Sequence, residues 1–179
     1  MVMNGIITLE NKAEVLKHVM RNWASGVAVL TSSCMGARAG TTVSSFTSLS
    51  LEPPLVLVNI AKENPLQTMI EENGYFGLSV LDDSQREISN LFAGFGKRIQ
   101  DRFKGVETFT LTSESPLLMG AIAHLDCRVF NRCELPKSVV VIGEVIDGTF
   151  SENDNPLLYF NRDYAELCHP QPAISKKGN

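Results

Sequence analysis

The chain has 179 residues, and roughly 150 residues per domain makes a single domain the expected organisation. Hydrophobic residues make up 44% of the chain and charged residues 20%, which excludes a disordered or collagen-like protein and provides for a core. Sixteen Lys and Arg against 20 Asp and Glu give a net charge of −4. That balance argues against a nucleic-acid-binding protein, because such proteins usually carry a basic footprint.

The N-terminal segment lacks the features of a secretory signal. Glu10, Lys12 and Glu14 lie where such a signal needs an uninterrupted apolar run, and no later apolar run reaches the length of a membrane span. We therefore expect a soluble, cytoplasmic protein. The four cysteines form no CxxC pair, so we expect reduced thiols and no metal site.

No repeat, linker or block of charge divides the chain. We expect one domain over residues 1–168 and a flexible C-terminal tail over residues 169–179. The tail contains two prolines and ends in Lys-Lys-Gly-Asn, a composition typical of loose chain ends.

The first helix is predicted soon after the start of the chain. Asn11, followed three residues later by Glu14, forms a capping-box pattern. Apolar residues within 15–23 recur at roughly helical spacing, and Gly26 is expected to end the segment near the first strand.

Two further helices interrupt a chain otherwise rich in strand signals. The helix over residues 65–72 has Asn64 as its N-cap and Pro65 at its first position. The helix over residues 85–93 opens with Ser84 as its expected cap.

Six segments carry the apolar and β-branched residues typical of strands. They cover residues 27–31, 41–50, 55–60, 75–81, 121–130 and 138–146. In 121–130 apolar and polar residues alternate, which predicts one buried face and a polar face that exposes His124 at the surface. Six strands with few helices favour an antiparallel barrel over a doubly wound sheet.

The most polar run lies within the predicted strand 41–50, where seven of ten residues are Ser or Thr. Hydroxyl groups and backbone amides at this density suit a ligand with many hydrogen-bonding atoms, such as an oxidisable ring or a phosphate. A Thr-rich strand facing solvent is the alternative interpretation.

A second candidate is the segment that leads into the helix at Pro65. A helix N-terminus presents free N–H groups and the positive end of the helix dipole, which attract phosphate. Lys62 before the helix and Thr68 within its first turn could add donors.

Two stretches of the chain carry distinctive motifs. Residues 26–31 read Gly-Val-Ala-Val-Leu-Thr, and residues 42–56 contain the Ser/Thr run followed by Pro-Pro. Both stretches resemble the flavin reductase-like family, the FMN-binding split barrels. Shorter motifs follow in the family's order as far as the Gly-Glu-Val of residues 143–145, so the resemblance covers about residues 20–165.

The resemblance implies a mainly β fold, a six-stranded Greek-key split barrel with a few flanking helices. It also implies a homodimer that holds a flavin without a covalent bond near the subunit interface. Carried over by position, the expected cofactor-binding residues are Thr42, Val43, Ser44, Ser45, Ser48, Ser50, Ala61, Lys62, Asn64, Thr68, Arg102 and Phe103. For Arg102 the alternative is a solvated basic face shared with Lys97, Arg98 and Lys104.

One departure from the family concerns the reductant. Many relatives that use NAD(P)H carry Gly-Asp-His before the strand that leads to Gly-Glu-Val, whereas residues 136–138 here read Pro-Lys-Ser. The His that relatives place near the nicotinamide is therefore absent.

The resemblance implies reduction of FMN, with FAD as the other candidate, by NADH or NADPH. The electrons then pass to an acceptor or to a partner oxygenase. No catalytic residue is assigned, because the cofactor itself carries the reactive atoms. Besides a pyridoxamine-phosphate-oxidase-like activity on a related split barrel, two alternatives stay open. One is a flavoredoxin-type electron carrier that retains FMN and is reduced by a protein donor, and the other is a flavin-binding module without turnover.

Overall fold

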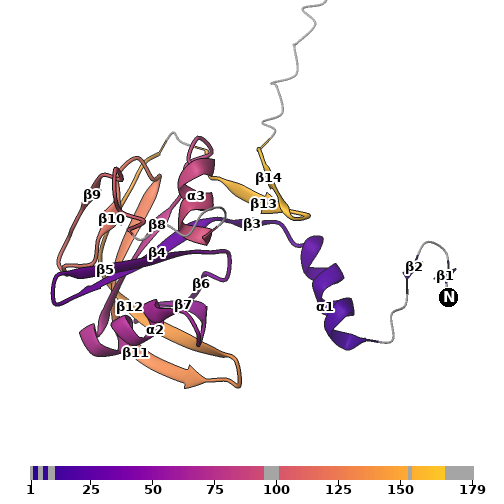
Figure 1. Cartoon of the computed structure of the whole chain (residues 1–179), viewed down its shortest axis with the longest axis horizontal. Helices are drawn as coiled ribbons and strands as arrows, with labels where there is room; N and C mark the ends of the chain where they lie inside the picture. Colours follow the sequence, from indigo (N-terminus) through magenta and orange to yellow (C-terminus); the bar gives the residue numbers. More distant parts are fainter. Residues whose placement is uncertain (1, 4–5, 8–10, 95–100, 153–154, 168–179) are drawn as a thin grey trace, which may run out of the picture.

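The computed structural model describes residues 2–3, 6–7, 11–94, 101–152 and 155–167 (Figure 1). The helices in these ranges are α1 (Lys12–Arg21), α2 (Pro65–Asn73) and α3 (Arg86–Ala93). The strands of the main sheet are β4 (Ala28–Cys34), β5 (Ala37–Val43), β6 (Thr47–Leu51), β7 (Pro54–Ala61), β8 (Tyr75–Val80), β11 (Ala123–Glu134) and β12 (Ser138–Phe150). The remaining short strands are β1 (Val2–Met3), β2 (Ile6–Ile7), β3 (Ser25–Gly26), β9 (Thr108–Phe109), β10 (Leu117–Leu118), β13 (Leu158–Phe160) and β14 (Asp163–Ala165).

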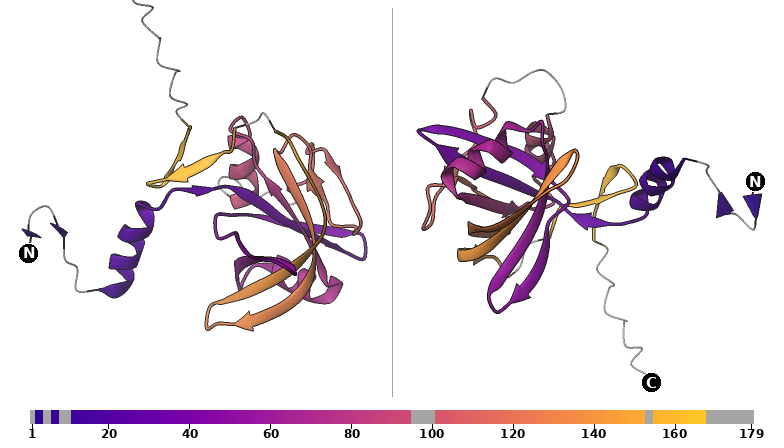
Figure 2. Two further views of the ribbon diagram at one scale, coloured as in Figure 1. Left: turned by 180° about the vertical axis from the view of Figure 1, so that it is seen from behind. Right: turned by 90° about the horizontal axis from the view of Figure 1, so that it is seen from below.

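The main sheet is antiparallel throughout, in the order β5-β4-β8-β11-β12-β7-β6. Its two edge strands, β5 and β6, are consecutive in the chain and are joined by residues 44–46, so the curved sheet is a barrel with a split (Figure 2). All six predicted strand segments lie in this sheet. The segment predicted as one strand over 41–50 leaves one edge at Val43 and joins the other at Thr47.

Strand β4 carries buried apolar side chains on both faces of the sheet. Ala28 and Leu30 belong to the cluster inside the barrel, which α2 closes with Leu66 and Ile70. Val29, on the opposite face of β4, belongs to a second cluster beneath α3. Both faces of β4 are therefore buried, which explains why its sequence is apolar without alternation.

The prediction that His124 is exposed is wrong. Its side chain is 6% exposed, and Nε2 donates a hydrogen bond to the carbonyl of Leu118, 2.7 Å away. On the same face of β11, the buried carboxylate of Asp126 accepts hydrogen bonds of 2.6 Å from both N–H and Oγ of Ser113. The segment that contains β9 and β10 covers this face of β11. The polar side chains of His124 and Asp126 are therefore buried between that segment and the sheet.

The predicted N-cap residues are confirmed for two of the three helices. Asn11 caps α1 through a hydrogen bond from Ala13, and Asn64 caps α2 through one from Leu66. The third cap differs, because α3 begins after Gln85 and no side chain caps it. Ser84 instead donates to the carboxylate of Asp82, which fixes the turn before the helix.

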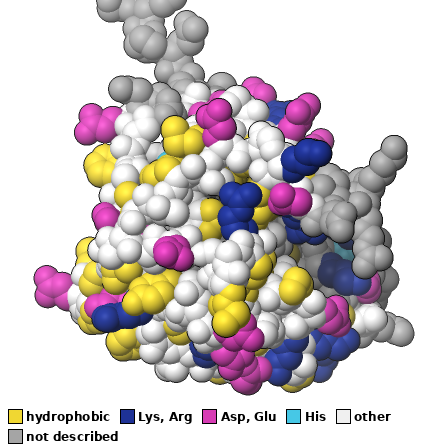
Figure 3. Space-filling view, turned by 60° about the vertical axis from the view of Figure 1, so that its left-hand side comes forward, with side chains coloured by type: hydrophobic (Ala, Val, Ile, Leu, Met, Phe, Trp, Pro, Cys, Tyr) yellow, Lys and Arg dark blue, Asp and Glu magenta, His cyan; other side chains and the backbone are white. Residues whose placement is uncertain are grey.

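Helix α1 stands outside the barrel, beyond β3 (Figures 1 and 2). It ends at Arg21, before the expected end near Gly26, and none of its residues is buried. Its apolar side chains are exposed, with Leu16 at 61% and Val19 at 58%. None of the described helices has the length and apolar character needed to span a membrane. On the face of the molecule in Figure 3, basic and acidic side chains are interspersed.

Candidate functional site

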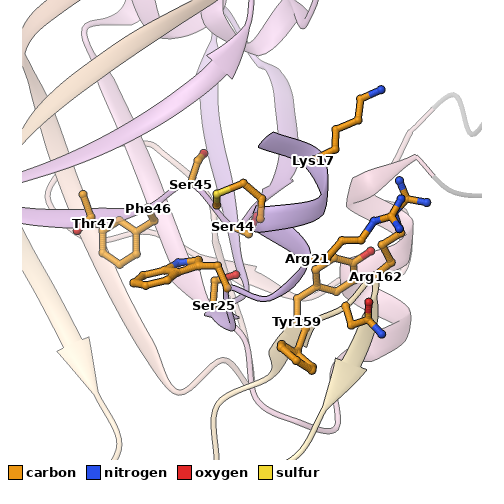
Figure 4. Close-up of a pocket in the computed structure, with 13 residues that line it drawn as sticks. Lys17, Arg21, Ser25, Ser44, Ser45, Phe46, Thr47, Tyr159 and Arg162 are labelled. Carbon is orange, nitrogen blue, oxygen red and sulfur yellow. The ribbon is translucent and has the colours of Figure 1, made fainter. Parts of the chain in front are cut away.

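Three pockets line up along residues 40–47, where β5 ends and β6 begins. The first, of about 730 Å³, lies beside the start of α2 and is lined in part by Gly40 and Thr41. The second, of about 180 Å³, is lined by Thr42 and Ser44. The third, of about 550 Å³, lies between residues 44–47, α1 and the β13–β14 turn (Figure 4). We call them the α2 pocket, the link pocket and the α1 pocket.

This alignment follows from the split in the barrel. From Thr41 to Ser45 the chain advances four residues, which at about 3.3 Å each covers about 13 Å of extended backbone. Thr41 lines the α2 pocket and Thr42 lines the link pocket, whereas Val43 points into the barrel core. Ser44 lines both the link pocket and the α1 pocket. Ala93 lines both the α2 pocket and the link pocket, so the three pockets adjoin one another and form a path from the α2 pocket to the α1 pocket.

The Ser/Thr run contributes side chains with different surroundings. Thr42 donates a hydrogen bond of 2.6 Å to the carbonyl of Ser89 on α3, and Val43 is buried in the barrel core. Ser45 donates to the carbonyl of Asn59, 3.0 Å away on β7. Ser44 is exposed and has no hydrogen-bond partner among the described residues, so its hydroxyl is available to a ligand.

Ser48 and Ser50 lie further along, on β6. Ser48 is exposed, and the hydroxyl of Ser50 donates to the carbonyl of Pro53 within the β6–β7 turn. Neither residue lines the three pockets described above.

The predicted residues in and before α2 also fall into two groups, those that line a pocket and those that do not. Ala61 and Asn64 line the α2 pocket. Lys62 instead forms an ion pair of 2.6 Å with Glu134 on β11, and its hydrogen bond lowers the pKa of that carboxyl group. Thr68 is exposed on α2, outside the pocket, and accepts a hydrogen bond from Gln67.

The N-terminus of α2 differs from the expected anion site in one respect. Pro65 has no N–H group, the N–H of Leu66 is bonded to Oδ1 of Asn64, and that of Gln67 to the Asn64 carbonyl. The donors of the first turn are thus used within the helix. Positive charge in the α2 pocket comes from Arg38 and Arg102, neither of which belongs to the helix.

Arg102 is half-buried and does not belong to a solvated basic face. Its Nη1 donates to the carbonyls of Phe92 and Gly40, at 2.8 and 3.2 Å. Phe103 beside it is buried against Phe92, with ring centroids 5.1 Å apart, and the guanidinium of Arg38 lies 4.7 Å from the Phe103 ring centroid. The two residues thus form one wall of the α2 pocket. Lys97 and Arg98 lie outside the described residues.

Several residues that line the pockets were not predicted from the sequence. They are Arg38, Thr41, Trp23, Phe46, Tyr159, Tyr164, Arg21 and Arg162. Thr41 and Phe46 lie within the Ser/Thr run and could have been included with it. The others come from distant segments, and their convergence depends on the fold.

The described residues contain no group of three or more His, Cys, Asp or Glu that could hold a metal ion. Cys34, Cys127 and Cys133 are free thiols, and burial raises the pKa of Cys127. Cys168 lies outside the described residues.

Comparison with known proteins identifies the family. Residues 20–167 match the model of the flavin reductase like domain. An actinorhodin polyketide dimerase of Streptomyces coelicolor is 32% identical over 155 residues, which cover 86% of each chain. The reductase component of 4-hydroxyphenylacetate 3-monooxygenase from Thermus thermophilus is 32% identical over 157 residues, 88% of this chain and 98% of that one.

A solved structure extends the likeness to the fold. The NADH:FAD oxidoreductase SgcE6 of Streptomyces globisporus superposes with a TM-score of 0.84 at 29% identity, covering 92% of this chain and 99% of that one. Three observations indicate the same family: the barrel, the Ser/Thr run at its split, and the match over residues 20–167. The chain belongs to the flavin reductase-like family.

Proposed function

We propose that this protein reduces FMN with NADH or NADPH, acts as a homodimer and supplies the reduced flavin to a partner oxygenase. Its family makes it a flavin-binding oxidoreductase. We further propose that residues 1–168 form one flavin-binding domain in the cytoplasm, where nicotinamide nucleotides are available.

The observation that carries the proposal is the path of three pockets along residues 40–47. A flavin nucleotide is an extended molecule with a ring, a polyol chain and a phosphate. The α1 pocket offers the aromatic residues Trp23 and Phe46 together with the hydroxyl of Ser44, a combination that suits a planar ring with hydrogen-bonding edges. The link pocket, which is lined by Thr42, suits the polyol chain of the flavin.

The α2 pocket fits the phosphate end. Arg38 and Arg102 line it together with Glu63 and Asp101, and guanidinium groups match phosphate geometry with paired donors. We propose that this phosphate is the terminal phosphate of FMN rather than part of the pyrophosphate of FAD. Of the twelve predicted residues, Thr42, Ser44, Ser45, Ala61, Asn64, Arg102 and Phe103 line the path and are retained in the proposed site. Val43, Ser48, Ser50, Lys62 and Thr68 are proposed to support it from outside.

When bound, the flavin supplies the hydride acceptor, while the protein binds and orients the ring. The polar groups of residues 41–45 that line the pockets would hold the ring in position. The reductase reading is favoured over the electron carrier because the Thermus thermophilus and Streptomyces globisporus proteins are both named for flavin or monooxygenase reductase activity. The name of the former also favours an oxygenase as the partner.

The exposed face of α1 supports the proposed homodimer. A helix of ten residues is marginal in water unless its apolar face is covered, and the barrel of the same chain leaves Leu16 and Val19 exposed. The barrel has its own exposed apolar side chains at Leu51 (84%) and Phe130 (57%). A second copy could cover both patches at once, because a two-fold interface uses the same surfaces twice.

The test of the proposed reaction is a steady-state assay of NADH and NADPH oxidation with and without added FMN. We expect oxidation that depends on the flavin, with a lower KM for FMN than for FAD. Oxidation of neither nucleotide, with FMN still bound, would contradict the reductase and favour the electron carrier or the binding module.

A further inference from the structure

Two arginines from separate elements meet at one end of the α1 pocket. Arg21 is the last residue of α1, and Arg162 lies in the turn between β13 and β14. The two elements are joined because the N–H of Asn161 donates to the carbonyl of Arg21, 2.9 Å away. Figure 4 shows the side chains of Arg21 and Arg162 beside each other, with Phe46 and Thr47 at the opposite end.

Among the described residues neither guanidinium group forms an ion pair, although Arg21 interacts electrostatically at longer range with Glu14 on the same helix. Among the described residues, no carboxylate lies within ion-pair distance of Arg21 or Arg162, and no Asp or Glu lines the α1 pocket. The Nε of Arg21 is buried and has no hydrogen-bond partner in the described part of the chain. Lys17, the third cation of the pocket, differs because it is paired with Glu14 at 2.6 Å.

The backbone at Arg162 adds a second, independent observation. Asn161 and Arg162 have φ angles of 48° and 67°, the left-handed conformations of a two-residue hairpin turn. Asn is common at the first of these positions, but Gly is favoured at the second. An arginine there is strained, and such strain is characteristic of positions where the side chain has a function.

The chemistry of hydride transfer determines what these cations face. The nicotinamide ring must contact the flavin ring for the hydride to pass, and the proposed ring site lies along residues 44–47 of the same pocket. The rest of the nucleotide then extends from that point. It carries a pyrophosphate, and in NADPH a further phosphate, which two unpaired guanidinium groups are suited to bind.

We propose that Arg21 and Arg162 bind the phosphate groups of the nicotinamide dinucleotide and thereby determine affinity for the reductant. The inference rests on the proposed function for the place of the flavin ring. It assigns the two ends of the path to different molecules, with the flavin phosphate at the α2 pocket and the reductant's phosphates at the α1 pocket.

The test replaces both arginines in the full-length protein, Arg21→Gln with Arg162→Gln, and compares three hydride donors. NADH and NADPH carry the phosphates, whereas N-benzyl-1,4-dihydronicotinamide carries none. We expect KM for NADH and NADPH to rise about tenfold or more, since a charge-assisted contact of ordinary strength corresponds to about that factor. The rate with the phosphate-free donor and the affinity for FMN should not change.

Lys12→Gln provides the matched control. It removes one positive charge from the same helix, but Lys12 is exposed and does not line the α1 pocket. The double variant Arg21→Lys with Arg162→Lys keeps the charge and should recover part of the affinity. A rise in KM with Lys12→Gln as large as with the arginine variants would overturn the inference, because it would indicate a general charge effect.

A binding measurement separates this inference from the proposed function. Trp23 is the single tryptophan of the chain and lines the α1 pocket, so its fluorescence reports on occupancy without turnover. Titration with NAD⁺ and NADP⁺ should quench Trp23 in the native protein, at concentrations about tenfold lower than in the double glutamine variant. Equal affinities of the two proteins for NAD⁺ and NADP⁺ would overturn the inference even if the native protein is an active reductase.

Discussion

The Nη1 atom of Arg102 lies 2.8 Å from the carbonyl oxygen of Phe92, to which it donates a hydrogen bond at the end of α3. The same nitrogen reaches the carbonyl of Gly40 on β5, 3.2 Å away. The closeness of the elements is also evident at Gly40, where an added Cβ would lie 2.7 Å from the ring of Phe92. One side chain therefore joins a helix end to the strand that leads into the Ser/Thr run.

Replacement of this arginine should affect both the fold and the site. Arg102→Met keeps an unbranched side chain similar to the aliphatic part of arginine but removes the guanidinium group, and with it both hydrogen bonds and the charge. We expect the free energy of unfolding to fall by about 1–2 kcal/mol, because two carbonyls lose a charged donor. Affinity for FMN, measured by quenching of flavin fluorescence, should fall as well. Lys104→Met, at an exposed neighbouring position, should change neither quantity.

The hydroxyls of Ser44 and Ser45 should contribute to flavin affinity more than to stability. The double replacement Ser44→Val with Ser45→Val removes both hydroxyls, of which only that of Ser45 has a hydrogen bond within the described residues. We expect FMN to bind about tenfold more weakly or worse, with little change in the thermal unfolding midpoint. Ser151→Val, at an exposed site away from the pockets, is the control. Unchanged FMN affinity in the double variant would remove these residues from the site.

The buried His124 should make stability depend on pH. Burial lowers its pKa below the usual 6.5, although the hydrogen bond to Leu118 partly offsets this effect. Between the lowered pKa and 6.5 the unfolded chain binds more protons than the folded protein. The stability that neutral His124 contributes is therefore complete above 6.5 and is lost as the pH falls toward the lowered pKa.

Urea unfolding at about pH 7.5 and about pH 5.5 tests this dependence. His124→Gln should show a smaller loss of unfolding free energy between the two pH values than the native protein. His18→Gln, which replaces an exposed histidine of α1, should retain the native loss. If all three proteins lose the same free energy, groups other than His124 cause the dependence.

The apolar face of α1 should determine the oligomeric state. Leu16→Glu with Val19→Glu places two charges on the exposed face, and we expect the proposed dimer to dissociate to a species of 19.7 kDa. Light scattering during gel filtration measures this mass. Met35→Glu, at a fully exposed apolar residue of the β4–β5 turn, should leave the mass of the native protein unchanged. A native protein that is itself monomeric would contradict the homodimer.

Local patterns predicted the elements that depend on near neighbours. The helix at Pro65 followed from Asn64 as its cap, because the cap and the first turn are adjacent in the sequence. The six strands followed from β-branched runs between turns, and the Ser/Thr run coincided with the split in the barrel. These features depend on residues within one turn or one strand of each other.

Features that depend on distant contacts were not predictable in this way. His124 was expected at the surface because its strand alternates, yet the segment that contains Leu118 folds over that face. The ion pair of Lys62 with Glu134 joins the segment before α2 to β11, and no local pattern indicates it. Arg21 and Arg162 are far apart in the sequence and carry no local motif, so only the fold brings them to one pocket.

An anaerobic visible spectrum of the full-length protein with FMN, before and after addition of NADH and then NADPH, tests the central claim most directly. The account predicts that the oxidised flavin absorbance bleaches rapidly with at least one of the two nucleotides. A bound flavin that stays oxidised with both, and is reduced only when dithionite is added, would contradict a nicotinamide-dependent reductase.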